Sequence, residues 1–249
     1  MPIQLSNLNH DQDWPELGCL LFKSSANVYH SFFNSLHPIP NTTSKNREEY
    51  IRISIAQVKS ECISDPTSHT LKAVNIETGK IVGGALLNIY IKNKPTNTDD
   101  QKFQSVGSYA CEGEGEYVIL PRTIKQSQIS RAGLTDQPHI FLYAIATDLE
   151  HQYDGDEAAQ LLLNWGIERA SSLGIELWAY TTSPNVELYK AHGFELTNEM
   201  IADPGVADVR QQCETEGRYR QFTFWSWRRP AVRNREMQKQ FYLDTEGFW

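Results

Sequence analysis

The feature that most constrains this chain is a strand–helix–strand–helix pattern in its C-terminal half. The run "HIFLYAIAT" (139–147) is continuously apolar, which is typical of a strand covered on both faces. Polar and apolar residues at helical spacing follow it, and "IELWAYT" (175–181) predicts a second strand. Two strands joined through a helix pair in parallel, and the crossover places the helix N-terminus beside the end of the first strand. The chain is therefore predicted to contain a parallel α/β unit.

The ends of the two predicted helices are marked by residues with strong positional preferences. Gly174 follows the first helix at the usual position of a C-terminal glycine. Ser183 and Pro184 provide an N-cap and a first-turn proline for a short second helix, which Gly193 closes.

The N-terminal half predicts two helices, over residues 14–36 and 47–60, and a hairpin. The second helix rests on four apolar residues between polar positions: Ile51, Ile53, Ile55 and Val58. Two β-rich runs in residues 70–92 flank the turn "ETGK", which predicts the hairpin. Residues 93–115 are polar and rich in turn formers, so they form either a substrate lid or a disordered loop.

The composition favours a soluble globular protein, with 40% hydrophobic and 22% charged residues in a chain of 249. The net charge of −8 disfavours nucleic acid or an anionic membrane surface as a partner, because both need clustered Lys and Arg. No run approaches the ~18 apolar residues that cross a bilayer, and the start "MPIQLSNLNHDQDWPELG" lacks a secretory pattern. We therefore expect a cytoplasmic or nuclear protein, and a homodimer is an open alternative.

The cysteines are expected to be reduced thiols in or near the core. Cys19, Cys62, Cys111 and Cys213 have no CxxC spacing and no nearby pair of histidines. Neither a metal site nor a disulfide framework is therefore predicted.

Four short stretches between residues 137 and 194 occur in a specific order. They are Pro138-His139, Ile145-Ala146-Thr147, "YDGDEAAQLLLNWG" (153–166) and "SPNVELYKAHGF" (183–194). In this order they resemble the GNAT superfamily of acyl-CoA-dependent N-acetyltransferases, and most closely the small-molecule type common in fungi. The resemblance covers about a quarter of the chain, and the rest has a compatible order of elements.

The resemblance implies an α/β fold with a central mixed, twisted sheet and helices on both faces. It implies one domain over residues 1–228 and a C-terminal extension over 229–249, which is a docking helix, a dimer contact or a frayed end. It also implies an acyltransferase that moves an acetyl or other acyl group from acyl-CoA to the amine of a small molecule. The alternative is a GNAT-fold protein that has lost CoA use, and that catalyses a different reaction in the same cleft or only binds a partner.

The resemblance also assigns residues to acetyl-CoA, the implied cofactor. The backbone of Ile145, Ala146 and Thr147 would pair with the pantetheine arm. The following loop and helix N-terminus would hold the diphosphate on backbone N–H groups, a physically favoured anion site. The residues in this group are Asp154, Gly155, Glu157, Ala158 and Ala159, with Ser183 as a further cofactor-binding residue.

Tyr189 matches the family's tyrosine that protonates the departing CoA thiolate. A phenol with a pKa near ~10 can supply a proton to a thiolate with a pKa near ~8.5 without itself being ionised. A tyrosine on a short helix before "GF" can also simply pack its ring and bond its hydroxyl locally.

The loop departs from the family's Q-x-x-G-x-G/A pattern because it is acidic. Asp156 occupies the position of the family's added arginine, and Glu157 occupies that of a glycine or of the last small residue. A carboxylate ~5 Å from a phosphate charge costs about 3 kcal/mol at an effective dielectric near 20. Asp154 and Glu157 also form a capping-box pattern, in which each side chain satisfies a free backbone N–H. The segment is thus an anion-binding loop, a damaged one or an ordinary helix cap.

Acyl transfer to an amine also needs a base, and His139 at the start of the first strand is the first candidate. Glu116, Tyr143 and Glu176 are further candidates by position, and a histidine at a strand start can equally be structural.

Aromatic residues could shape the acceptor site. Trp178, Trp225 and Trp227 would either line an aromatic pocket or pack into the core. For the last two, the alternating run "RQFTFWSWRR" (220–229) favours a final strand with a core side.

Overall fold

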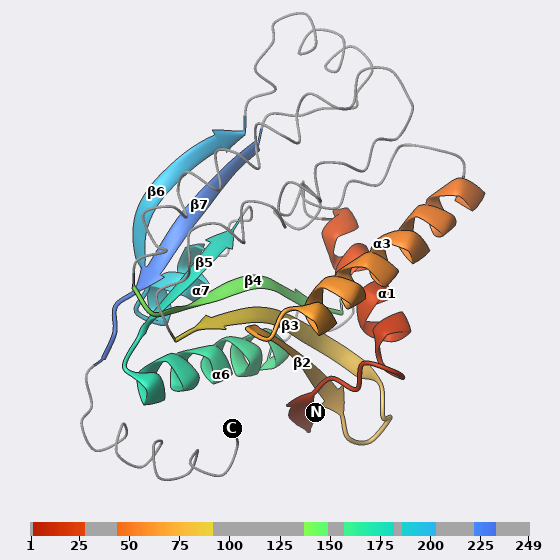
Figure 1. The fold of residues 1–249 in the computed structure, drawn as a ribbon, viewed down its shortest axis with the longest axis horizontal. Helices are drawn as coiled ribbons and strands as arrows, with labels where there is room; N and C mark the ends of the chain where they lie inside the picture. Colours follow the sequence, from red (N-terminus) through yellow and green to blue (C-terminus); the bar gives the residue numbers. More distant parts are fainter. Residues whose placement is uncertain are drawn as a thin grey trace, which may run out of the picture.

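The structure is a computed structural model that describes residues 2–27, 44–91, 137–148, 157–181, 186–202 and 222–232. These residues form one seven-stranded sheet in the order β1-β2-β3-β4-β5-β7-β6, with helices on both faces (Figure 1). The strands are β1 (Ile3–Asn7), β2 (Ser68–Asn75), β3 (Ile81–Tyr90), β4 (His139–Thr147), β5 (Glu176–Thr181), β6 (Glu195–Ala202) and β7 (Phe222–Arg229). The helices are α1 (Trp14–Asn27), α3 (Ser44–Ser64), α6 (Glu157–Leu173) and α7 (Val186–Ala191). The predicted mixed α/β sheet is confirmed, since β4 and β5 are parallel and the other neighbours are antiparallel.

The strand–helix–strand unit has the predicted arrangement. β4 spans the predicted apolar run, α6 follows it, and β5 pairs with β4 in parallel. Gly174, at φ 65°, and Gly193, at φ 77°, follow α6 and α7 in the left-handed conformation that favours glycine. The predicted N-cap at Ser183 and Pro184 lies outside the described residues.

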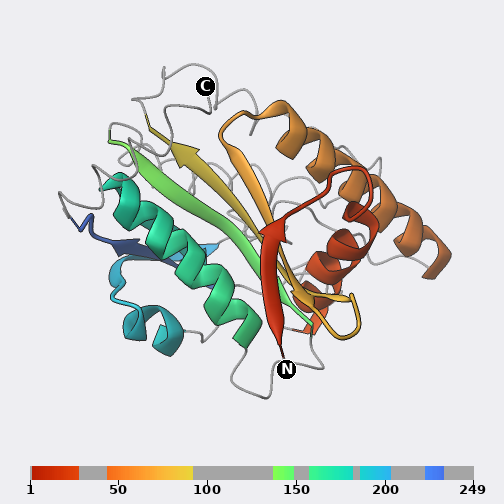
Figure 2. The same ribbon diagram turned by 90° about the horizontal axis from the view of Figure 1, so that it is seen from below.

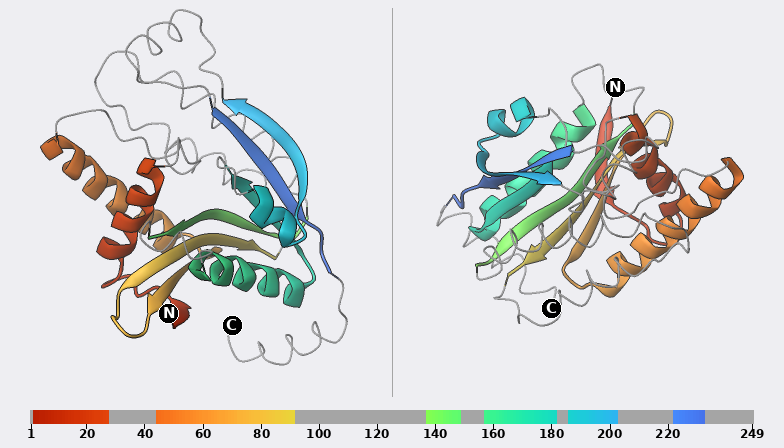
Figure 3. Two further views of the ribbon diagram at one scale, coloured as in Figure 1. Left: turned by 180° about the vertical axis from the view of Figure 1, so that it is seen from behind. Right: turned by 90° about the horizontal axis from the view of Figure 1, so that it is seen from above.

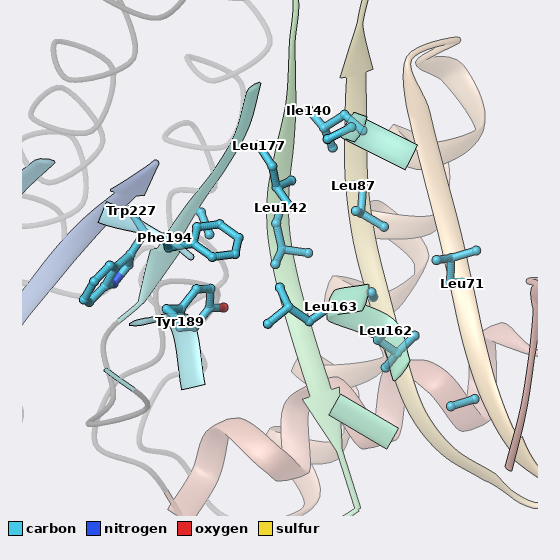
Figure 4. Packing of buried hydrophobic residues seen from close by; sticks show 14 of the residues in the cluster. Leu71, Leu87, Ile140, Leu142, Leu162, Leu163, Leu177, Tyr189, Phe194 and Trp227 are labelled. Atoms are coloured by element: carbon cyan, nitrogen blue, oxygen red, sulfur yellow. The ribbon is translucent and has the colours of Figure 1, made fainter. Parts of the chain in front are cut away.

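Two apolar clusters hold the helices to the sheet, one on each face. On one face, α6 packs Leu162 and Leu163 over strand residues such as Leu87 (Figure 4). On the other face, α1 and α3 pack against Leu86 and Ala146. Figures 2 and 3 show α6 on one side of the sheet and α1 with α3 on the other. Because successive strand residues point to opposite faces, cluster membership shows which face a strand residue occupies.

The N-terminal elements are confirmed, with some different boundaries. The hairpin around "ETGK" is present as β2 and β3, with Gly79 at φ 72° in its turn. α1 begins at Trp14, and the predicted continuation beyond Asn27 lies outside the described residues. α3 is longer than the predicted 47–60, and the helical period turns Ile53 to solvent, where it is 46% exposed.

Within the described ranges, no helix is long and apolar enough to span a membrane. The same residues contain no group of three or more His, Cys, Asp or Glu side chains that could hold a metal ion. Cys19 and Cys62 are free thiols, the first exposed and the second half-buried. The predicted loop 93–115, Cys111, Cys213 and the end of the chain beyond Val232 lie outside the described residues.

Candidate functional site

The central feature of the site is a separation of the two parallel strands. The β4–β5 ladder runs from the pair His139–Glu176 to the pair Leu142–Ala179 and ends there. Beyond this point β4 continues to Thr147 along β3, and β5 continues to Thr181 along β7. Figure 1 shows β4 and β5 diverging toward their C-terminal ends. We call this region, between the later halves of β4 and β5, the strand separation.

A β-bulge in β4 accounts for the separation. Leu87 pairs with Leu142 and Leu86 pairs with Ala144, so Tyr143 is an extra residue on β4. A bulge bends its strand and increases the local twist. Because Tyr143 directly follows Leu142, the last residue paired with β5, the bend turns the remainder of β4 away from β5.

The first turn of α6 lies against the far end of β4. A Cβ atom built at Gly83 of β3 would be 3.2 Å from Ala158 Cβ, 3.2 Å from Leu162 Cδ1 and 3.3 Å from Thr147 Cγ2. The absence of a side chain at Gly83 therefore lets the start of α6 approach the end of β4 closely. This confirms the predicted position of the α6 N-terminus beside the end of the first strand.

The predicted cofactor residues of α6 differ in exposure. Ala158 and Ala159 are buried, Ala158 by packing on Gly83, whereas Glu157 is exposed. Asp154, Gly155 and Ser183 lie outside the described residues, as does Asp156. The capping box and the anion-binding loop therefore both stay as alternatives.

A carboxylate at the end of β4 is paired with a lysine from the β2–β3 turn. Lys80 Nζ lies 2.6 Å from Asp148 Oδ2, and the Asp148 backbone N–H donates to the Val82 carbonyl at 2.9 Å. Asp148 follows Thr147 directly, so the pair lies where the chain leaves β4 toward the acidic loop. Lys80 offsets the first negative charge of that segment.

Tyr189 of α7 is held by two aromatic rings. Its ring stacks on Trp227 with centroids 5.9 Å apart and meets Phe194 edge-on at 5.2 Å. Trp227 is itself fixed, because its Nε1–H donates to Thr181 Oγ1 at 2.9 Å. In Figure 4 the Tyr189 hydroxyl points from the β5 side toward β4, on the face that α6 covers.

The burial of Tyr189 has an electrostatic consequence. The residue is 7% exposed, and burial raises the pKa of its phenol far above the usual value near 10. The hydroxyl is therefore protonated throughout the neutral range, as a proton donor must be.

His139 lies on the opposite face of the sheet from Tyr189. Ile140 and Leu142 belong to the cluster that contains Tyr189, so the alternation along β4 directs His139 to the other side. His139 is buried, and its Nδ1 lies 2.8 Å from the Gln137 carbonyl oxygen. Because a carbonyl oxygen accepts, Nδ1 carries the proton in the neutral ring and Nε2 is the basic nitrogen. The His139 ring also packs 4.9 Å from the ring of Tyr90.

Glu176 is engaged through both carboxylate oxygens. Arg228 donates its Nε–H to Oε1 at 2.9 Å, with a further contact from Nη2, and Trp178 donates its Nε1–H to Oε2 at 3.0 Å. Partial burial opposes ionisation, but the hydrogen bonds from Arg228 and Trp178 outweigh it and lower the pKa of Glu176. A carboxylate that is ionised and accepts hydrogen bonds at both oxygens is a weak proton acceptor, so Glu176 does not fit the role of base. Glu116 lies outside the described residues.

The tryptophans divide between core and surface. Trp227 is fully buried in the apolar cluster under α6, and Trp225 packs against that cluster from the same strand. These positions confirm the final-strand interpretation of "RQFTFWSWRR". Trp178 is half-buried and pairs with Arg228 across the β5–β7 ladder.

Solved structures match this arrangement, whereas no protein-family model and no curated protein sequence does. A Corynebacterium glutamicum protein described as a histone acetyltransferase and related acetyltransferase has a TM-score of 0.56 at 19% identity, covering 94% of this chain and 99% of its own. The polyamine N-acetyltransferase of Drosophila melanogaster, which forms N-acetylagmatine, has 0.56 at 14%, covering 91% and 99%. The C-terminal condensation domain of Ebony, in complex with beta-alanyl-dopamine, has 0.57 at 12%, covering 91% and 98%. The chain has the GNAT acetyltransferase fold.

Within this GNAT fold, most of the residues predicted from the sequence lie around the strand separation. Ile145, Ala146 and Thr147 occupy the part of β4 beyond its last pair with β5. Ala158 begins the helix packed on that part, and the Tyr189 hydroxyl is directed toward it. His139 lies where the ladder starts, on the other face. The cofactor and catalytic roles of these residues remain predictions.

Three features of the site were not predicted from the sequence. They are the bulge at Tyr143, the Lys80–Asp148 pair and the hydrogen bonds that hold Glu176. The Lys80–Asp148 and Arg228–Glu176 contacts join residues that are 68 and 52 positions apart, so no local pattern indicates them. Two adjacent arginines in an otherwise apolar final strand are the one visible signal for the Glu176 pair.

Proposed function

We propose that this protein transfers an acetyl or other acyl group from acyl-CoA to the amine of a small molecule. The observation that carries the proposal is the strand separation at the Tyr143 bulge, with the protonated hydroxyl of Tyr189 directed toward it. Strand backbone beyond the last β4–β5 pair is suited to an amide-containing arm, which adds to a sheet edge as an extra strand does. Bound CoA would supply an activated thioester.

The residues along β4 and α6 suit that arm and its diphosphate. Ile145, Ala146 and Thr147 would bind the pantetheine through their backbone. The N-terminus of α6, at Glu157 and Ala158, would attract the diphosphate through the helix dipole. Two observations support this fit: Ala158 is small, and Lys80 offsets the charge of Asp148. The loop residues Asp154 and Gly155, with Ala159 and Ser183, complete the proposed set.

The two proton transfers of the reaction, one from the amine and one to the leaving sulfur, would take place on opposite faces of the sheet. His139 Nε2 would accept the proton that the attacking amine releases. Tyr189 would give its proton to the leaving sulfur, and its raised pKa keeps that proton in place until the sulfur becomes basic. His139 lies at the first β4–β5 pair and Tyr189 lies on the opposite face, so the amine and the leaving sulfur would be reached from opposite faces of the sheet.

The acceptor is proposed to be a small amine. The similarity to the Drosophila polyamine N-acetyltransferase supports this class, at the level of fold. The net charge of −8 supports it independently, since an acidic protein concentrates cationic ligands near its surface.

A second candidate function is amide formation from a donor other than CoA. The acidic residues Asp154, Asp156 and Glu157 at the start of α6 favour it, because they repel a diphosphate. The similarity in fold to the Ebony condensation domain supports this second candidate, because that protein is described as a condensation domain rather than as an acetyltransferase.

A turnover assay separates the two candidates. Purified protein is incubated with acetyl-CoA and a panel of polyamines, arylalkylamines and amino acids, and free thiol is measured together with the N-acetylated product by mass spectrometry. Amine-dependent thiol release with matching product supports CoA-dependent transfer. If no amine gives product, the CoA proposal fails. In that case the double variant Asp156→Arg with Glu157→Gly is assayed for CoA binding, and gained affinity would identify the acidic loop as the reason.

A further inference from the structure

A carboxylate beside His139 has no part in the proton transfers described above. His139 and Glu176 are Cα partners in the first pair of the β4–β5 ladder. Residues directly opposite each other in neighbouring strands direct their side chains to the same face. Glu176 therefore lies next to the proposed base, and an electrostatic interaction connects the two side chains.

Two donors fix the position of this carboxylate. Arg228 binds Oε1 through Nε at 2.9 Å, and Trp178 binds Oε2 through Nε1 at 3.0 Å. Arg228 is also the cross-strand partner of Trp178 and lies 6.0 Å from its ring centroid. Glu176 thus cannot swing away from His139 without losing both hydrogen bonds, one of them charge-assisted.

The hydrogen bond of His139 determines which of its ring nitrogens would act as base. Nδ1 donates to the Gln137 carbonyl, so in the neutral ring Nε2 is the unprotonated nitrogen, the one that a proton would join. Among the described residues, the ionisable and charged groups that face His139 include Tyr90 of β3 and Glu176 of β5, with Arg228 of β7 behind Glu176. Glu176 is the negative one of these at neutral pH.

We propose that Glu176 is a positioning residue that stabilises the protonated form of His139 during acyl transfer. The inference rests on the proposed function, in which the N–H bond of the attacking amine breaks and a new N–H bond forms at His139 Nε2. Glu176 neither gains nor loses a proton in this step. Its negative charge lowers the energy of the imidazolium, and Arg228 limits the effect because it offsets part of that charge.

The first test is the pH profile of kcat/KM for wild-type protein and three variants. Glu176→Gln is expected to move the acidic limb of the profile to lower pH, by about one pH unit for the loss of a nearby charge. Arg228→Gln is expected to move the limb the other way, because it leaves the carboxylate without its counter-charge. Glu195→Gln is the matched control, since Glu195 is the cross-strand partner of Arg228 from β6 but lies away from His139.

The second test does not depend on turnover. The ring resonances of the protein's seven histidines are titrated by NMR, and the His139 signal is identified by its loss in His139→Gln. The titration midpoint of His139 is expected to move to lower pH in Glu176→Gln and to higher pH in Arg228→Gln, and to stay unchanged in Glu195→Gln. If Glu176→Gln does not fold, Arg228→Gln alone carries the test, because it retains the carboxylate.

The outcomes separate this proposal from the function on which it rests. A His139 titration that is unchanged in both Glu176→Gln and Arg228→Gln overturns the proposal, even if amines are acetylated normally. Equal displacement in Glu195→Gln also overturns it, because the effect would then be one of general surface charge. If the titration moves as expected but no amine is acetylated, the link between Glu176 and His139 stands and the acyltransferase function fails.

Discussion

At the residue scale, the ring and the hydroxyl of Tyr189 have different roles: the ring packs, and the hydroxyl is the proposed proton donor. Its ring contributes to the core through Trp227 and Phe194, and its hydroxyl points toward β4 within the same apolar cluster. A phenylalanine can keep the ring contacts and lose only the hydroxyl. His139 and Glu176 also have separate proposed roles, since His139 carries a basic nitrogen and Glu176 carries a negative charge held in place by hydrogen bonds.

Tyr189→Phe tests the role of the hydroxyl. Loss of a general acid typically lowers turnover by ~10²-fold or more, so kcat is expected to fall by about that factor. The dissociation constant for acetyl-CoA is expected to change little, because the ring remains in place. Steady-state kinetics and calorimetry on the same preparation measure both quantities. Wild-type turnover in the variant would remove Tyr189 from the mechanism.

The raised pKa of Tyr189 also predicts a pH dependence of stability. In the unfolded chain this phenol ionises near pH ~10, whereas burial keeps it protonated in the folded state. The stabilisation is complete below pH ~10 and is lost as the pH rises further, by up to about 1.4 kcal/mol for each pH unit. Urea unfolding between pH 9 and 11 should therefore show a shallower loss of stability in Tyr189→Phe than in wild type. Identical slopes would mean that the hydroxyl is solvated in the folded state.

At the element scale, the site depends on where three elements meet. The bulge at Tyr143 turns β4 away from β5, and Gly83 of β3 lets the start of α6 approach the end of β4. The parallel pairing follows from the crossover connection, but the position of the bulge does not. The position of the α6 N-terminus beside the end of β4 thus depends on α6, β4 and β3 together.

Gly83→Ala tests this packing. The new Cβ would lie 3.2 Å from Ala158 Cβ, on a helix backbone that must shift to relieve the contact. Overpacking of this kind typically costs about 1–3 kcal/mol, and displacement of the α6 N-terminus should also weaken acetyl-CoA binding. Gly166→Ala is the control, because its Cβ would meet Leu87 Cδ2 at 3.3 Å in the middle of α6. Equal weakening of binding in both variants, measured by calorimetry, would show that the start of α6 has no special role.

At the scale of the whole molecule, the sequence predicts the centre of the sheet better than its edges. The apolar run of β4, the amphipathic α6 and Gly174 specify their elements through local pattern, and all three are confirmed. β1 and β6 were not predicted, because edge strands expose much of their surface and read as polar sequence. The exposed residues Glu195 to Glu199 illustrate this.

The same division applies to the candidate site. Residues carried by local motifs, such as Tyr189 and Thr147, can be named as candidates from the sequence alone. The Lys80–Asp148 and Glu176–Arg228 pairs could not be, because tertiary structure alone brings their partners together. A negative charge such as that of Asp148 can be offset by a residue far away in the chain.

Calorimetric titration of acetyl-CoA into the protein, with Tyr189→Phe as a parallel sample, tests whether CoA binds at the strand separation. Binding in the micromolar range is expected, about −8 kcal/mol at ~1 μM, with similar affinity in the two proteins. No heat of binding at millimolar acetyl-CoA would contradict it and would leave a GNAT fold that works with another donor.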